Sequence, residues 1–232
     1  MNEFIEKAIN PYQYDSYEKG LNSFNPQFFG KIISKNLKNI SQKNIVDIGS
    51  GTGWLLGLLK NLGTGSIKGV EPSLRSIKIS KKAFPNISVF HGTLDNFKPK
   101  EKFHIAISIM VFEHIHDVTS AFSKIAAMMK KNGKLYIVVG DSKYFTTPRL
   151  DYKLTVKNID KDTVVVKVRR PQGVIHDIFR SISYFTKCAK QTGFTLEKHI
   201  KVKPSQEVLE VNPKYLHFKN TVMFHLLIFK LT

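Results

Sequence analysis

Short apolar runs alternate with amphipathic segments along most of the chain. The runs that are typical of buried strands cover residues 44–48, 66–70, 86–90, 103–110 and 134–139. Helical spacing follows the first of them, since Leu55, Leu58, Leu59 and Leu62 recur at every third or fourth position. Strands that alternate with helices predict an α/β fold, with a parallel sheet and helices on both faces.

Capping residues place the ends of the helices. Ser73 is suited to cap a helix that runs through Ala83. Asp117 is suited to cap a second helix, which we expect to continue through Lys130 and Lys131 and to end at Asn132-Gly133.

The pattern changes after Asp141. Tyr152–Lys157 and Thr163–Arg169 alternate as strands do and predict an antiparallel hairpin. A helix from Ser181 to Thr192 and two closing strands should follow, the strands covering Phe194–Val202 and Val222–Leu231. We therefore expect a Rossmann-like, seven-stranded, mostly parallel sheet whose last strand is antiparallel and inserted.

One domain accounts for this order of elements. Its predicted parts are an N-terminal helical lid (1–43), an α/β core (44–141), a hairpin cap (142–180), and a C-terminal helix with the closing strands (181–232). The lid carries an aromatic group that either packs or closes over the site: Tyr12, Tyr14, Tyr17 and Phe24.

Composition excludes several classes of protein. Of 232 residues only Cys188 is a cysteine, so no internal disulfide scaffold is formed. The first residues are charged where a signal peptide would be apolar, and the longest apolar stretches are too short to span a bilayer. We expect a soluble, cytoplasmic protein with no membrane span.

The formal net charge of +18 leaves two interpretations open: a surface that attracts anions, or a lysine-rich, solvated exterior. The lysines are spread evenly, which favours the second. Four of the five arginines fall in one stretch, at Arg149, Arg169, Arg170 and Arg180. Since guanidinium groups bind carboxylates and phosphates well, this stretch suggests an acceptor that carries one of those groups.

The strongest chemical signal is the glycine-rich turn from Asp47 to Gly53. It lies between the first strand and the first helix, where glycines let a ligand approach the backbone. A dinucleotide fingerprint reads G-x-G-x-x-G, whereas this turn reads Gly49-x-Gly51-x-Gly53 after an aspartate. That carboxylate would repel a pyrophosphate but would suit a cofactor that bears an ammonium and a sulfonium.

Residues 46–53 resemble motif I of class I S-adenosylmethionine-dependent methyltransferases. Residues 112–117 resemble the E-H segment after strand four in the small-molecule branch of that superfamily. The His-Asp pair in residues 173–177 resembles that of some O-methyltransferases of the ubiquinone-biosynthesis type and of some sugar methyltransferases. Residues 130–134 resemble the loop before strand five. The resemblance covers about residues 40–141 and implies S-adenosylmethionine as the cofactor.

The resemblance also implies roles for individual residues. Backbone atoms of the motif would contact the methionine part of the cofactor, Glu71 would hold the ribose, and Thr93 and Leu94 would flank the adenine. Thr93 stands where relatives often have an aspartate, and Asp95 is an alternative adenine contact. The complete implied cofactor set is Asp47, Gly49, Ser50, Gly51, Gly53, Glu71, Pro72, Thr93, Leu94 and Met110.

Two histidines are candidate catalytic bases, because imidazole titrates near neutral pH. His114 follows the fourth strand, and a structural role competes with catalysis there. His176 precedes Asp177 just before the late helix, and the competing interpretation is a surface histidine beside a capping aspartate. The spacing of His114, His116 and Asp117 fits no strong metal signature, so we expect no metal.

The acceptor follows partly by exclusion. The Asn/Asp-Pro-Pro-aromatic segment of nucleobase amino methylation is missing at residues 108–111, and Cys188 reads as a plain buried thiol. We therefore expect methyl transfer to an oxygen or nitrogen of a small metabolite. An RNA or protein methyltransferase, or a non-catalytic cofactor-binding subunit, is the less favoured alternative.

Overall fold

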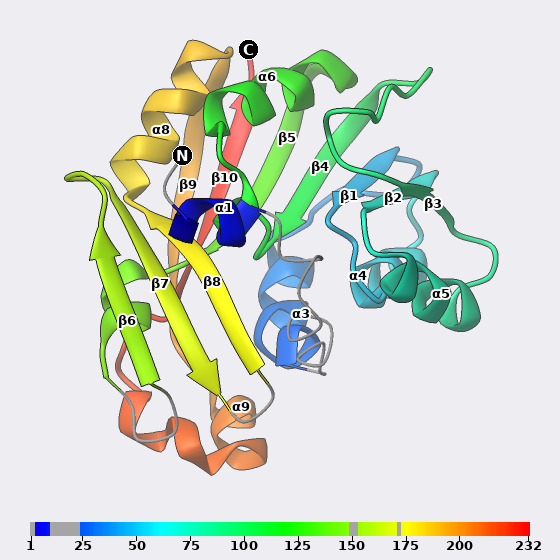
Figure 1. The fold of residues 1–232 in the computed structure, drawn as a ribbon. Coiled ribbons are helices and arrows are strands. Elements are labelled where there is room, and N and C mark those ends of the chain that lie inside the picture. The colour runs from blue at the N-terminus through cyan, green and yellow to red at the C-terminus, as the bar shows by residue number, and fades with distance from the viewer. Residues whose placement is uncertain (1–2, 10–23, 149–152, 171–172) are drawn as a thin grey trace.

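The computed structural model describes residues 3–9, 24–148, 153–170 and 173–232. At its centre is a seven-stranded sheet in the order β3-β2-β1-β4-β5-β10-β9 (Figure 1). Its strands are β1 (Ile45–Ile48), β2 (Ile67–Glu71), β3 (Ser88–His91), β4 (Phe103–Ile109), β5 (Met129–Gly140), β9 (Phe194–Val202) and β10 (Phe224–Leu231). Neighbours from β3 to β5 are parallel, and β10 lies antiparallel between β5 and β9. The predicted sheet and its inserted last strand are confirmed.

Helices cover both faces of this sheet. The helices of the described residues are α1 (Glu3–Ile9), α3 (Phe24–Asn36), α4 (Trp54–Asn61), α5 (Leu74–Ala83), α6 (Val118–Met128), α7 (Ser142–Thr146), α8 (Ile182–Gln191) and α9 (Gln206–Val211), with 3₁₀ turns η2 (Phe112–His114) and η3 (Pro213–Phe218). Ser73, Asp117 and Ser181 cap α5, α6 and α8 through their side chains. The caps expected at Ser73 and Asp117 are therefore present, and Ser181 adds a third.

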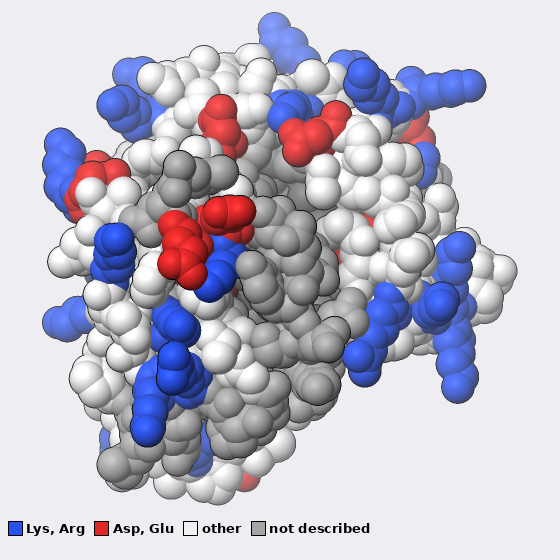
Figure 2. Space-filling model, viewed as in Figure 1, with Lys and Arg blue, Asp and Glu red and all other residues white. Residues whose placement is uncertain are grey.

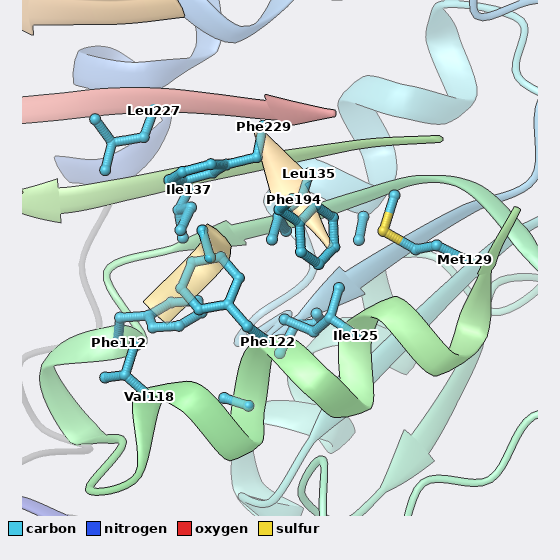
Figure 3. Packing of buried hydrophobic residues seen from close by; sticks show 14 of the residues in the cluster. Phe112, Val118, Phe122, Ile125, Met129, Leu135, Ile137, Phe194, Leu227 and Phe229 are labelled. Atoms are coloured by element: carbon cyan, nitrogen blue, oxygen red, sulfur yellow. The ribbon is translucent and has the colours of Figure 1, made fainter. Parts of the chain in front are cut away.

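Each face of the sheet buries its own apolar cluster. Residues of α3 and α4 pack on one face, and residues of α6 and α8, Cys188 among them, pack on the other. Figure 3 shows the second cluster, in which Phe122 meets Phe112 at 5.6 Å and Phe229 at 5.3 Å between ring centroids. Because Phe112 is completely buried, this cluster holds η2 firmly against the core.

The expected boundary between α6 and β5 is wrong. The helix ends at Met128, and Lys130 to Gly133 belong to β5. Two residues of β4, Phe103 and Ile105, pair with Met129 and Lys134, so β5 bulges between those partners. Asn132 has a φ of +61° within this bulge, which explains how an Asn-Gly turn signal lies inside a strand.

The cap contains a strand that the sequence pattern does not predict. β6 (Lys153–Asn158) and β7 (Thr163–Arg170) form the expected hairpin, and β8 (Gly173–Arg180) adds a third antiparallel strand. Asp177 therefore lies in a strand and not at a helix cap. The last residues of β8 are all buried. This end of the strand therefore lacks the alternation of apolar and polar residues that marks a half-exposed strand.

Helix α1 packs on this smaller sheet, where Ala8 joins Val165 and Ile178 in a separate apolar cluster. The expected lid residues Tyr12, Tyr14 and Tyr17 lie outside the described residues. No helix among the residues that the structure describes is long and apolar enough to cross a membrane.

Candidate active site

The glycine turn after β1 is held against β2. The amides of Gly49 and Ser50 donate to the carbonyl of Val70, at 2.8 and 3.1 Å. Gly49, Gly51 and Gly53 all have positive φ, at 71°, 52° and 84°. Since residues with side chains rarely adopt this conformation, the three glycines are needed for the path of the turn itself.

The glycines differ in what surrounds them. A Cβ on Gly49 would lie 2.3 Å from Cγ2 of Val111, and one on Gly53 would lie 2.2 Å from Oγ of Ser80. A Cβ on Gly51 would meet no atom of the described residues within 4 Å. Gly49 and Gly53 thus allow close packing inside the protein, whereas Gly51 faces open space that a ligand can use.

Glu71 joins the turn to the end of β2. Its Oε2 accepts from the amide of Gly51 and its Oε1 from the amide of Ser73, both at 2.8 Å. The side chain is buried, with 2% of its surface exposed. Each carboxylate oxygen has a second lone pair, so both oxygens can also accept from hydroxyl groups of a ligand.

Asp47 is a buried carboxylate beside Glu71. Burial, reinforced by the charge of Glu71, raises the pKa of Asp47 to about 8. Nothing among the described residues compensates its charge with a cation or a hydrogen bond to the carboxylate. S-adenosylmethionine carries an ammonium and a sulfonium and therefore fits this site, whereas a pyrophosphate would add further negative charge.

The remaining predicted cofactor residues surround the same turn. Ser50 is buried, and its Oγ lies 2.7 Å from a Cβ built on Gly69, so only its backbone can face a ligand. The Pro72 carbonyl lies 3.1 Å from Nε2 of His91. Met110 follows β4 with a φ of +56°, a strained conformation of the kind that clusters at functional sites.

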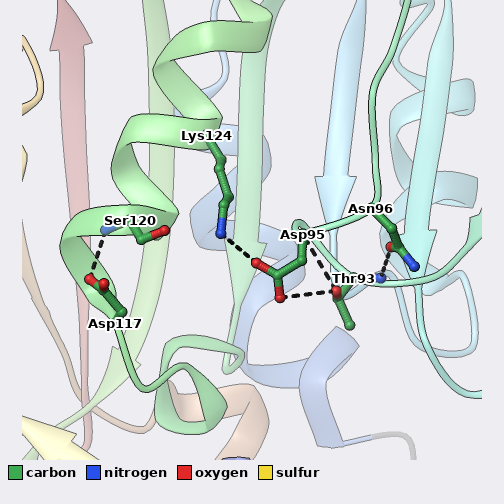
Figure 4. A network of polar contacts seen from close by, with 6 residues as sticks. All are labelled: Thr93, Asp95, Asn96, Asp117, Ser120 and Lys124. Carbon is green, nitrogen blue, oxygen red and sulfur yellow. Dashed lines mark hydrogen bonds and ion pairs between the residues drawn. The ribbon is translucent and has the colours of Figure 1, made fainter.

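Thr93 belongs to a polar network after β3 (Figure 4). Its amide donates to Oδ1 of Asn96 at 2.8 Å, and its hydroxyl accepts from the amide of Asp95 at 3.2 Å. Asp95 in turn pairs with Lys124 of α6. Leu94 packs against the apolar cluster of α6 and α8. The network thus holds the loop at the tip of β3, and the Asp95 carboxylate already has a cationic partner.

The structure brings His114 and Asp177 together. Nδ1 of His114 lies 2.9 Å from the carbonyl of Ala8, and Nε2 lies 3.7 Å from Oδ1 of Asp177. A carbonyl can only accept, so Nδ1 carries the hydrogen and Nε2 is the nitrogen that gains or loses a proton. An imidazole that is oriented by one group and faces a carboxylate is a typical arrangement for a general base.

His176 lies on the opposite face of β8 from Asp177, because neighbouring residues of a strand point in opposite directions. Its ring meets that of Phe4 at 5.7 Å between centroids. Burial, followed by the charges of Lys167 and Lys7, lowers the pKa of His176 to about 4. The imidazole is therefore neutral at physiological pH, and the two predicted bases do not share a site.

Glu113 is a buried acid that the sequence singled out only through the E-H segment. Oε1 accepts from the amide of Gly140 at 2.7 Å, and Oε2 has no partner among the described residues. Burial raises the pKa of Glu113 to about 8, although the hydrogen bond from the Gly140 amide acts in the opposite direction. The carboxyl joins the ends of β4 and β5 directly beside His114.

Arg180 has a structural role that its position in the arginine stretch does not predict. It is 6% exposed, and its guanidinium donates to the carbonyls of Phe112, Ile115 and His116 at 3.1, 2.7 and 3.1 Å. Arg149 lies outside the described residues, and Arg169 is exposed on β7. Arg180 therefore anchors the segment that carries His114 and does not serve as an anion-binding group.

Comparison with known proteins places the chain in a family. A methyltransferase domain model matches residues 21–199. Ubiquinone biosynthesis O-methyltransferase from Rhodopseudomonas palustris (strain HaA2) is 32% identical over 108 residues, which are 45% of this chain and 42% of the relative. The corresponding protein of Bradyrhizobium sp. (strain ORS 278) is 31% identical over a stretch of the same extent. The similarity thus spans about two fifths of the length of these curated relatives.

Solved structures share the fold. A putative S-adenosylmethionine-dependent methyltransferase from Listeria monocytogenes superposes with a TM-score of 0.72 at 16% identity, over 88% of this chain and 96% of that one. The PH0226 protein of Pyrococcus horikoshii superposes with a TM-score of 0.71 at 18% identity, over 96% and 98%. The chain belongs to the methyltransferase domain family, and its fold is that of S-adenosylmethionine-dependent methyltransferases.

Proposed function

We propose that this protein transfers the methyl group of S-adenosylmethionine to a hydroxyl oxygen of a small molecule. The observation that carries the proposal is the buried pair of Asp47 and Glu71 beside the open space at Gly51. The names of the partly matching relatives support oxygen as the acceptor atom. When bound, the cofactor supplies an electrophilic methyl on a sulfonium.

The chain's own residues would hold the cofactor by charge and shape. Asp47 would bind the ammonium, and Glu71 would accept from the ribose hydroxyls while it keeps the turn in place. Thr93 and Leu94 would flank the adenine. Pro72 and Met110 would line the floor of the site. Because Asp47 carries no compensating cation of its own, it favours a cationic cofactor over a dinucleotide.

On the acceptor side, His114 is the candidate base. Its Nε2 would take the proton that the acceptor hydroxyl loses, and the Asp177 carboxylate would stabilise the imidazolium that results. Ala8 and Arg180 position this group, the first through the Nδ1 hydrogen bond and the second through the carbonyls around η2. His176 would have no role in the transfer.

Titration calorimetry with S-adenosylhomocysteine tests the cofactor assignment first. The wild type should bind at micromolar concentration, and Asp47→Ala and Glu71→Ala should each abolish binding while circular dichroism shows a folded protein. Normal affinity in both variants would refute the site.

An acceptor screen then tests the reaction. Hydroxylated small molecules are compared with matched amines, and methyl transfer is followed with radiolabelled cofactor. Methylation of hydroxyls supports the proposal. Cofactor binding without turnover on any acceptor would favour a non-catalytic subunit instead.

A further inference from the structure

The sheet of β6, β7 and β8 has two chemically different faces. One face is apolar and packs inward, with Val166, Val168 and Phe179 buried against Phe145 of α7. The other face points outward and meets α1 only at one end, where Val165 and Ile178 contact Ala8. Away from α1, Lys153, Thr155 and Arg169 of the outer face are exposed.

Contacts with α1 show which side chains lie on the outer face. The ammonium of Lys157 lies 5.8 Å from the centroid of the Phe4 ring, and His176 meets the same ring. Lys153 alternates with Lys157 along β6, and Lys167 and Arg169 alternate with the buried Val168 along β7. We call the four basic residues Lys153, Lys157, Lys167 and Arg169 the basic face.

Cross-strand pairing brings like charges together on this face. Lys153 is directly opposite Arg169, whereas Lys167 is directly opposite His176, which is neutral. Like charges in such positions are unfavourable in a sheet that has no ligand. Burial is the main cause of the lowered pKa of His176, and the charges of Lys167 and Lys7 lower it further, against the charge of Glu3.

The acidic side chains of the described residues offset the basic face only in part, through Glu3 of α1, whose charge interacts with Lys167 and His176. Asp177 is the only acid within the three strands and lies on the other face. Glu3 of α1 pairs with Lys7, and Asp162 in the β6–β7 turn accepts from Ser181. Figure 2 shows basic side chains in a column below α1, with acidic ones gathered around α1 itself.

We propose that the basic face binds the phosphate backbone of single-stranded nucleic acid. Lys167 and Arg169 are separated by two residues along β7, or about 6.8 Å, a repeat that suits successive phosphates of an extended strand. An anionic membrane fits less well, because the exposed large apolar side chains of the described residues lie elsewhere, and Val156 of β6 points to the opposite face.

This surface is separate from the candidate active site. In β8, His176 lies on the basic face and Asp177 lies on the face toward His114. A bound strand would therefore lie across the β6–β8 sheet from His114, and it would retain the protein on nucleic acid without presenting a base for methylation. The inference does not depend on the proposed function.

Fluorescence anisotropy with a labelled single-stranded RNA oligonucleotide tests it. The test variant is Lys153→Gln/Lys167→Gln/Arg169→Gln. The matched control is Lys78→Gln/Lys81→Gln/Lys82→Gln on α5, where all three lysines are exposed and the same charge is removed. Circular dichroism and S-adenosylhomocysteine binding show that each variant remains folded.

The wild type should bind with a slope of about −2 in a plot of log affinity against log salt, as expected for three phosphates on a single strand. The test variant should lose at least tenfold in affinity and most of the slope, and the control should stay within about twofold of the wild type. Equal losses in both variants would show a general effect of net charge and would overturn the proposal. Absence of RNA binding, or stronger binding to anionic phosphatidylglycerol vesicles, would overturn it as well.

Discussion

Nε2 of His114 lies 3.7 Å from Oδ1 of Asp177, across the boundary between the main sheet and the β6–β8 sheet. His114 lies in η2 and Asp177 lies in β8, and the two residues are 63 positions apart in the chain. Their meeting joins the end of the α/β core to the cap, and it is the reason that we propose His114, of the two predicted histidines, as the base.

We expect His114→Gln to lower kcat by about 10²–10⁴-fold, the usual contribution of a general base. Affinity for S-adenosylhomocysteine should change little, since His114 does not belong to the glycine turn. The neighbouring His176→Gln is the matched control and should retain activity within about threefold. Equal loss in the two variants, measured by steady-state kinetics, would contradict the assignment.

Asp47 should make cofactor binding depend on pH. Its raised pKa of about 8 means that the ligand-free site holds a proton at neutral pH, which a cationic ligand must displace. Affinity for S-adenosylhomocysteine should therefore rise from pH 6.5 to 8.5. Calorimetry in two buffers of different ionisation enthalpy should show proton release near pH 7. Asp47→Asn should bind S-adenosylhomocysteine weakly and without this dependence on pH. Proton release that persists in the variant would exclude Asp47 as the source of the proton.

Glu113 should make the stability of the protein fall with rising pH. The pKa of the carboxyl is about 8 in the folded state against its ordinary value of 4.5, so the folded state binds more protons between those values. The free energy of unfolding then decreases by up to about 1.4 kcal/mol per pH unit in that window. Glu113→Gln removes this contribution. Urea unfolding at several pH values should show that the free energy of unfolding of Glu113→Gln rises relative to that of the wild type up to about pH 8. A difference between the two proteins that does not change with pH would contradict a buried, neutral Glu113.

Two glycines of the turn should respond differently to alanine. Gly51→Ala places its Cβ in open space, so it should cost only about 1 kcal/mol of backbone strain while it weakens S-adenosylhomocysteine binding at least tenfold. Gly49→Ala adds a clash with Val111 and should cost about 1–3 kcal/mol more. Paired measurements of urea unfolding and calorimetric affinity separate the two effects. Similar stability in both variants would mean that Val111 can move aside.

Arg180→Lys should destabilise the protein by about 2–4 kcal/mol, because an ammonium cannot reach three carbonyls with the planar fork of a guanidinium. Loss of these bonds frees η2, so kcat should fall together with the free energy of unfolding. Arg169→Lys is the control on the exposed face. It should leave kcat unchanged and should change the free energy of unfolding by no more than a few tenths of a kcal/mol.

Local patterns were sufficient wherever a segment's own periodicity decided its structure. The runs at β1, β2 and β4 are apolar because both faces of a central strand are covered, and the helices between them repeat with the period of a buried face. The capping roles of Ser73 and Asp117 could be predicted because a cap is a contact over three residues. The bulge at Asn132-Gly133 could not be predicted, because an Asn-Gly pair can either end a helix or lie in a bulge, and the partner strand decides which.

By itself the sequence determined the sheet with its inserted last strand, the glycine turn, and the acids Asp47 and Glu71 beside it, because spacing within a few residues specifies a turn and the tip of a strand. Only the tertiary structure decided that β8 is a strand, that Asp177 faces His114 and not His176, and that Arg180 is buried as an anchor. The last two depend on groups more than sixty positions apart in the chain, as the bonds from Arg180 to Phe112, Ile115 and His116 show, whereas β8 is a strand because it pairs with β7 just before it. Periodicity reports which face of an element is buried, and contacts between elements report which groups meet there.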